Sequence, residues 1–181
     1  MGKSTAYSRI MKRQAIELDK QFTIVTGCAV TVLWELYGWR NERIGKLTHY
    51  VSQIWRECAE AKDQCSMLEM CERETGIEMT LDGKRSYHEF PYLDHTKWKG
   101  RKFPTMQEEL YILNQEIQWI PTMMLACLLI ALHRKEKWGY QRLSRFAYCV
   151  NEIRKENHDA SYFRKLMKSK YDMTTAVVSL E

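Results

Sequence analysis

Six cysteines are the first residues of this 181-residue sequence to consider for chemistry, because thiolates bind zinc and act as nucleophiles. Cys58, Cys65 and Cys71 come closest to a metal cluster, but six and five residues separate them. Zinc sites generally place two to four residues between paired cysteines. The spacing therefore predicts no metal site and no cofactor. The other three cysteines stand among apolar neighbours and are expected in the core: Cys28, Cys127 and Cys149.

Histidines and carboxylates offer one further possibility for catalysis. No two of the five histidines have the spacing H-E-x-x-H or H-x-H. One segment holds two histidines and three carboxylates: His88, His95, Asp82, Glu89 and Asp94. A histidine beside carboxylates could activate water in a nuclease. The same residues are also typical of an ordinary loop. The sequence has no Gly-rich phosphate loop and no G-x-S-x-G motif, so we expect no catalytic residues and a protein that is not an enzyme.

A short segment combines basic residues with a tryptophan. Residues 97–102, KWKGRK, contain four Lys or Arg around that tryptophan. Basic side chains bind phosphates and aromatic rings stack on bases, so the pattern is typical of nucleic-acid binding. An exposed tryptophan can also anchor a protein partner, while a connecting loop with solvated lysines is the plain alternative. The candidate binding residues here are Lys97, Trp98, Lys99, Arg101 and Lys102.

Charge is distributed unevenly along the chain, whose formal net charge is +5. Residues 134–170 contain 11 Lys or Arg against 4 Asp or Glu, whereas residues 58–80 contain 2 against 6. A basic face suits an anionic partner such as DNA, RNA or an acidic protein surface. A solvated surface of mixed sign is the alternative. The further candidates for partner binding are Arg142, Arg145, Arg154, Arg164 and Lys165.

The elements that would position these residues are two similar units, 99 residues apart. Residues 6–57 align with residues 105–156 without a gap, and nine of the 52 pairs are identical. Shared helical periodicity can produce part of this similarity, but the absence of gaps favours a true duplication. Apolar spacings of three and four predict helices over 5–37, 42–60 and 66–74, and again over 105–137, 141–156 and 160–169.

A tryptophan, followed four residues later by an arginine, recurs at the turn between the first two helices of each unit. Trp39 and Trp138 are predicted to fill this corner, because a large ring buries much area there. Arg43 and Arg142 could stack on the rings or bond the free carbonyl groups of the preceding helix. They could instead be paired basic contacts for a partner. A glycine beside each tryptophan is expected to mark the turn: Gly38 and Gly139.

The expected fold is mainly α, a pseudo-two-fold helical bundle of two duplicated helix-turn-helix units with a small β-hairpin or loop insert. Asp82-Gly83 predicts the hairpin, and Thr105 with Glu108 makes a helix-start capping box. Pro121 is expected to kink or split its helix. The chain would form one compact domain made of a first unit 1–76, an insert 77–104, a second unit 105–175 and a tail 176–181.

Two features bear on where the protein is found. The first residues, MGKSTAYSRIMKRQ, are polar and basic and lack the apolar core of an export signal. The longest apolar run, residues 123–132, is too short to span a bilayer. We therefore expect a cytoplasmic protein with reduced thiols and no membrane partner.

The turn motifs LYGWRNERI and EKWGYQRL resemble a pattern of small phage and prophage proteins of gut Firmicutes, where an aromatic residue, a glycine and an arginine join two helices. The glycine precedes Trp39 but follows Trp138. Proteins of this class include anti-defence inhibitors, among them anti-CRISPR proteins that bind Cas9. The resemblance implies a bacterial host cytoplasm and a Cas9-type nuclease complex as partner. It also implies inhibition by occlusion, with the basic residues against DNA, guide RNA or an acidic Cas9 surface.

Two other functions stay open at this point. A DNA-binding phage transcriptional regulator could use the two turn units as helix-turn-helix modules, and it should prefer one DNA sequence and dimerise. A nuclease centred on the insert should lose its activity when His88, Glu89 or Asp94 is replaced by alanine. Neither the partner nor the oligomeric state follows from the sequence.

Overall fold

The computed structural model describes residues 3–60, 66–80, 106–156 and 158–173. Within these ranges the chain forms helices and turns and contains no strand. The helix bounds lie within two residues of those expected from the periodicity, so the prediction of a mainly helical protein is confirmed. The helices are α1 Lys3–Tyr37, α2 Asn41–Glu60, α3 Ser66–Thr75, α4 Met106–Glu136, α5 Tyr140–Lys155 and α6 Ala160–Ser169.

The expected insert, 77–104, is described only over residues 77–80, which belong to no strand. The hairpin predicted at Asp82-Gly83 and the capping residue Thr105 lie outside the described residues. The same is true of the predicted tail, 176–181.

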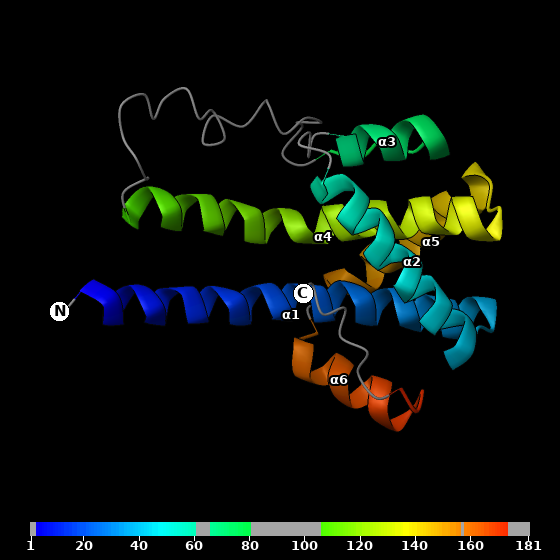
Figure 1. Cartoon of the computed structure of the whole chain (residues 1–181). Helices are drawn as coiled ribbons and strands as arrows, with labels where there is room; N and C mark the ends of the chain where they lie inside the picture. The colour runs from blue at the N-terminus through cyan, green and yellow to red at the C-terminus, as the bar shows by residue number, and fades with distance from the viewer. Residues whose placement is uncertain (1–2, 61–65, 81–105, 157, 174–181) are drawn as a thin grey trace.

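The helices of each predicted unit pack mainly against the first helix of the other unit. α1 and α4 lie side by side with their N-terminal ends on the same side of the molecule (Figure 1). α2 and α3 pack on α4, whereas α5 and α6 pack on α1. The second and third helices of each unit therefore pack on the first helix of the other unit, and the two units share one core.

The core is built from one apolar face of each helix. Residues 124–132 of α4 are all buried, which agrees with the buried helix expected from that apolar run. On α2 and α5 the buried residues recur at spacings of three and four, as an amphipathic helix requires: Ile44, Leu47, Val51 and Ile54, and Leu143, Phe146 and Val150.

Pro121 does not split its helix, so that part of the expectation is wrong. α4 is helical on both sides of the proline and through it. Proline offers no N–H to the carbonyl group four residues earlier, so one helical hydrogen bond is missing there. Ile120 and Met124 are buried on either side, and their packing holds both parts of the helix against the core.

Each corner between the first two helices of a unit contains one residue with a left-handed backbone. In the first corner it is Gly38, with φ 67°, and in the second it is Lys137, with φ 57°. The glycine expected to mark the second corner is not that residue, because Gly139 has φ −83° and is the N-cap of α5. A side chain in this region costs about 1–2 kcal/mol, so the packing around Lys137 must offset that strain.

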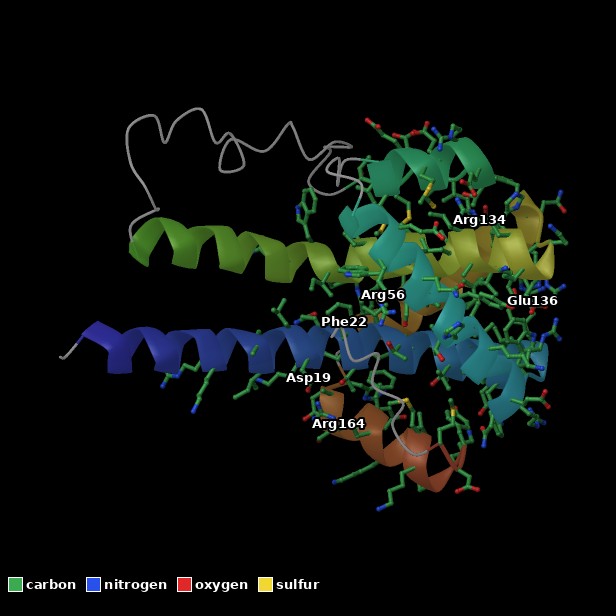
Figure 2. All side chains as sticks on the ribbon, viewed as in Figure 1. Asp19, Phe22, Arg56, Arg134, Glu136 and Arg164 are labelled. Carbon is green, nitrogen blue, oxygen red and sulfur yellow. The ribbon has the colours of Figure 1, made fainter. Side chains whose placement is uncertain are left out.

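α6 approaches α1 closely at Gly27. A Cβ atom at this position would lie 2.4 Å from the Phe163 ring, so only glycine allows the contact without displacement. The next residue of α6, Arg164, forms an ion pair with Asp19 of α1 (Figure 2). A close steric contact and a charge pair therefore fix α6 on α1.

Two ion pairs join the third helix of each unit to the first helix of the other. Arg134 of α4 donates to both carboxylate oxygens of Glu74 on α3, at 2.8 and 2.7 Å. Glu35 of α1, which stands 99 residues before Arg134, pairs with Lys170 at the end of α6 at 2.7 Å. The carboxylate is on the third helix in the first pair, whereas in the second pair the third helix ends in the cation. Each third helix therefore has the charge that fits its own position and not the other one.

We expect Arg134→Gln to lower the free energy of unfolding by about 1 kcal/mol at pH 7, a value reduced for the partial exposure of both side chains. Arg134 holds the pKa of Glu74 below its ordinary value. The pair therefore stabilises the fold above the unfolded pKa of about 4.3, and that stability is lost as the pH falls through the folded pKa. Urea unfolding at pH 7 and at pH 3 measures the difference. An effect of equal size at both pH values would contradict the role of the ion pair.

Candidate nucleic-acid interface

The two tryptophan corners pack inside the fold and meet each other there. Trp39 and Trp138 are each 2% exposed, and their rings meet edge to face with centroids 5.7 Å apart. The guanidinium carbon of Arg43 lies 4.2 Å from the Trp39 ring centroid, and that of Arg142 lies 4.1 Å from Trp138. The arginines thus stack on the rings, one of the two arrangements expected. Arg43 also forms an ion pair with Glu136 of α4, which is labelled in Figure 2.

Backbone hydrogen bonds fix both rings in the same way. The Trp39 N–H donates to the carbonyl of Leu33 at 3.0 Å, and the Trp138 N–H donates to Leu132 at 3.3 Å. Both indole Nε1 atoms are buried without a hydrogen-bond partner among the described residues, as is the Tyr37 hydroxyl. Buried donors without partners cost about 1–3 kcal/mol each, so ring burial and the stacked arginines must outweigh that loss.

The predicted binding residues have different surroundings. Arg142 stacks on the Trp138 ring at the corner, and Arg164 forms an ion pair with Asp19. Arg145, Arg154 and Lys165 are exposed and form no ion pair within the described part of the chain. The candidates of the insert lie outside the described residues: Lys97, Trp98, Lys99, Arg101 and Lys102.

A row of side chains follows the outer side of α5 at spacings of three and four residues. The row consists of Arg145, Tyr148, Glu152 and Lys155, which such spacing places on one helix face. Tyr148 is 65% exposed and stands between the basic ends of the row. Lys155 donates to Glu152 at 2.6 Å, and this hydrogen bond raises the pKa of Lys155, which keeps the lysine charged. Together with Arg154, we call this row the α5 face.

Two open hollows adjoin this face. A shallow one of about 520 Å³ lies along α5 itself, between Tyr148 and Lys155. The second, of about 510 Å³, lies between α1, α4 and the turn from α5 to α6. Arg154 lines both hollows, so one cationic side chain connects them.

The exposed tyrosines were not singled out by sequence reasoning. Tyr140 and Tyr148 are 59% and 65% exposed, and Tyr162 of α6 is also exposed. One signal was present for Tyr148. It falls two residues after Phe146 and two before Val150, away from the buried face, where an aromatic side chain is unusual for an amphipathic helix.

Cys28, Cys71 and Cys127 are buried in the core, and Cys149 is partly buried against it. Burial raises the pKa of Cys28 to about 12 and that of Cys71 to about 11, so both remain protonated at neutral pH. The Sγ atom of Cys127 lies 3.1 Å from the Met67 sulfur. Among the described residues, no three His, Cys, Asp or Glu side chains come together as metal ligands.

Comparisons with known proteins found no relative. A scan against protein-family models, a search of curated proteins and a search of solved structures each gave no match to this chain. In the part of the chain that the structure describes, no helix is both long and apolar enough to cross a membrane.

Proposed function

We propose that this protein is a non-catalytic binding protein whose α5 face binds a nucleic acid. The observation that carries the proposal is an exposed aromatic ring, Tyr148, in one helical row with Arg145 and Lys155 and close to Arg154. Bases stack on exposed aromatic rings, and cations beside such rings bind the phosphates between the bases. A row of this kind is thus suited to a strand whose bases are accessible.

The charges of the α5 face are available to a ligand. Arg145 and Arg154 form no ion pair among the described residues, so no protein carboxylate has to be displaced from them. Lys155 is held by Glu152, which reduces its contribution without removing it. Residues 134–170, which include α5 and α6, contain 11 Lys or Arg against 4 Asp or Glu. This excess of positive charge attracts an anionic polymer from a distance.

The biological role we propose is that of a phage anti-defence protein, which binds a Cas9-type nuclease complex and blocks it by occlusion. This finer step rests on the resemblance of the two turn motifs and on the basic insert. The insert residues Lys97, Trp98 and Arg101 would extend the contact with guide RNA, DNA or an acidic surface of the nuclease. The location that accompanies this role is the cytoplasm of the bacterial host.

Fluorescence anisotropy with a labelled single strand tests the nucleic-acid proposal. We expect binding that weakens with salt, since each phosphate neutralised on a single strand contributes a slope of about −0.7 to log K against log salt. Contacts from Arg145, Arg154 and Lys155 alone would give a slope of about −2. Absence of binding to any single strand at low salt would contradict the proposal.

Two outcomes of related measurements would redirect the functional assignment. A strong preference for one duplex sequence would favour the DNA-binding regulator over a binder of single strands. A pull-down from host lysate, repeated after nuclease treatment, asks whether a Cas9-type complex is retained through protein or through nucleic acid. Failure to retain such a complex in either case would remove the anti-defence role and leave nucleic-acid binding untouched.

We further propose that the two halves of the chain arose by duplication of one three-helix unit. The support is geometric: left-handed residues, tryptophan hydrogen bonds and stacked arginines recur 99 residues apart. Comparable losses of stability on disrupting the two corners would support this proposal.

A further inference from the structure

At the second hollow the two halves of the molecule differ in packing. Phe22 of α1 and Trp55 of α2 meet edge to face, with ring centroids 5.5 Å apart (Phe22 is labelled in Figure 2). The residues 99 positions later are Pro121 and Arg154, and both line the hollow. An aromatic pair fills the first location, whereas a small ring and a charged side chain leave the second one open.

The hollow has a size suited to a small ligand group. Its volume of about 510 Å³ falls within the range of about 300–1,000 Å³ usual for such sites. Its walls come from separate elements, since Gln21 and Gln118 stand on α1 and α4 and Asp159 stands in the turn before α6. Ile24 and Pro121 supply apolar surface. Polar groups that converge from several elements on a partly apolar hollow are typical of a binding site.

The chemistry of the walls favours a neutral ring over a phosphate. Arg154 supplies only donors, Asp159 supplies only acceptors, and the two glutamine amides supply both. The Asp159 carboxylate accepts hydrogen bonds from the Tyr162 N–H at 2.8 Å and the Ser161 hydroxyl at 2.9 Å, which lower its pKa and keep it ionised. A fixed negative charge repels a phosphate. A nucleobase is uncharged, flat and has donors and acceptors on its edge, so it matches this set.

An aromatic side chain, His158, is among the residues that line the hollow. The ring of His158 stacks on Tyr162 with centroids 3.9 Å apart and an interplanar angle of 16°. Its Nε2 atom is hydrogen-bonded to Glu156 at 3.0 Å. This ring is partly exposed and is held by these contacts, so it offers a surface on which an unstacked base can pack.

We propose that this hollow binds one unstacked base of a single-stranded nucleic acid whose phosphates follow the α5 face. The inference rests on the proposed function and adds to it the location and the chemical class of one specific contact. Arg154 is the link between the two parts, because it lines the hollow and the surface along α5. The same geometry places the base between α1 and α4, away from Tyr148.

The test uses the full chain and short single strands that contain the fluorescent base 2-aminopurine. A base in the hollow is separated from its neighbours, so its emission should rise on binding. The double variant Gln21→Leu with Gln118→Leu keeps side-chain size and removes both amides. It should abolish the rise and weaken binding about tenfold, the order expected for one lost base contact. The salt dependence should stay unchanged, since neither residue is charged.

A matched control separates the hollow from general effects of losing a surface glutamine. Gln53 is exposed on α2, and Gln53→Leu should leave both affinity and emission as in the unmodified protein. If the unmodified protein binds no single strand, the proposed function fails together with the inference. If it binds with the expected salt dependence, but the double variant has the same affinity and the same emission, only the inference about the hollow is overturned.

Discussion

Trp138→Ala is expected to lower the free energy of unfolding by about 3–5 kcal/mol, among the largest effects of any single substitution in this chain. The ring is 2% exposed and contacts three other aromatic rings, those of Tyr37, Trp39 and Phe146, at centroid distances of 4.6, 5.7 and 6.0 Å. Its removal leaves a cavity at the point where the two corners meet. It also takes away the surface on which Arg142 stacks.

Urea denaturation followed by far-UV circular dichroism measures this loss. Tyr140→Ala is the matched control, because that ring belongs to the same corner but is 59% exposed. It should change stability by no more than about 0.5 kcal/mol. Trp39→Ala should cost about as much as Trp138→Ala if the corners are equivalent. A difference of more than about 2 kcal/mol between the two tryptophan variants would contradict the equivalence of the two corners.

Gly27→Ala is expected to destabilise the protein by about 1–3 kcal/mol, although alanine is the better helix former. The added Cβ would lie 2.4 Å from two atoms of the Phe163 ring. α6 would therefore have to move away from α1 or the ring would have to leave its position. The Arg164–Asp19 ion pair resists that movement, because it holds the same helix to the same partner.

Gly45→Ala supplies a control of opposite sign. Gly45 lies within α2 on the exposed side, and a Cβ there meets nothing within 4 Å. This substitution should therefore stabilise the protein by about 1 kcal/mol. Thermal unfolding of both variants, and of Gly27→Ala in a Phe163→Ala background, completes the comparison. The cost of Gly27→Ala should fall once the ring is absent. A cost that is the same with and without the ring would show that the close contact is not its cause.

Local sequence patterns were sufficient for the helices and the corners. Spacings of three and four placed every helix to within two residues. The burial of Trp39 and Trp138 followed from the size of the ring at a tight turn. These features depend on residues close together in the chain, and such residues carry the signal that periodicity and turn chemistry report.

Features that depend on contacts between distant segments could not be foreseen in this way. An apolar face shows that a helix is packed, but not which helix covers it. The packing of the second and third helices on the first helix of the other unit was therefore not predicted. Lys137 adopts a left-handed conformation that its residue type does not suggest. Arg164 was considered a binding residue, whereas it pairs with Asp19, 145 residues away. Pro121 of α4 and Arg154 of α5 line one hollow together, and this is visible only once the helices are placed.

The most direct test of the proposed interface compares two matched charge reversals. Arg145→Glu with Lys155→Glu reverses the α5 face, and Lys46→Glu with Arg56→Glu changes the positions 99 residues earlier on α2. All four residues are exposed. The net charge falls by the same amount in both double variants, so any difference in affinity for a single strand reports location alone. We predict that the α5 reversal weakens binding about 30-fold or more at low salt, and that the α2 reversal weakens it less than about threefold. Equal losses in the two variants would contradict a binding interface on α5.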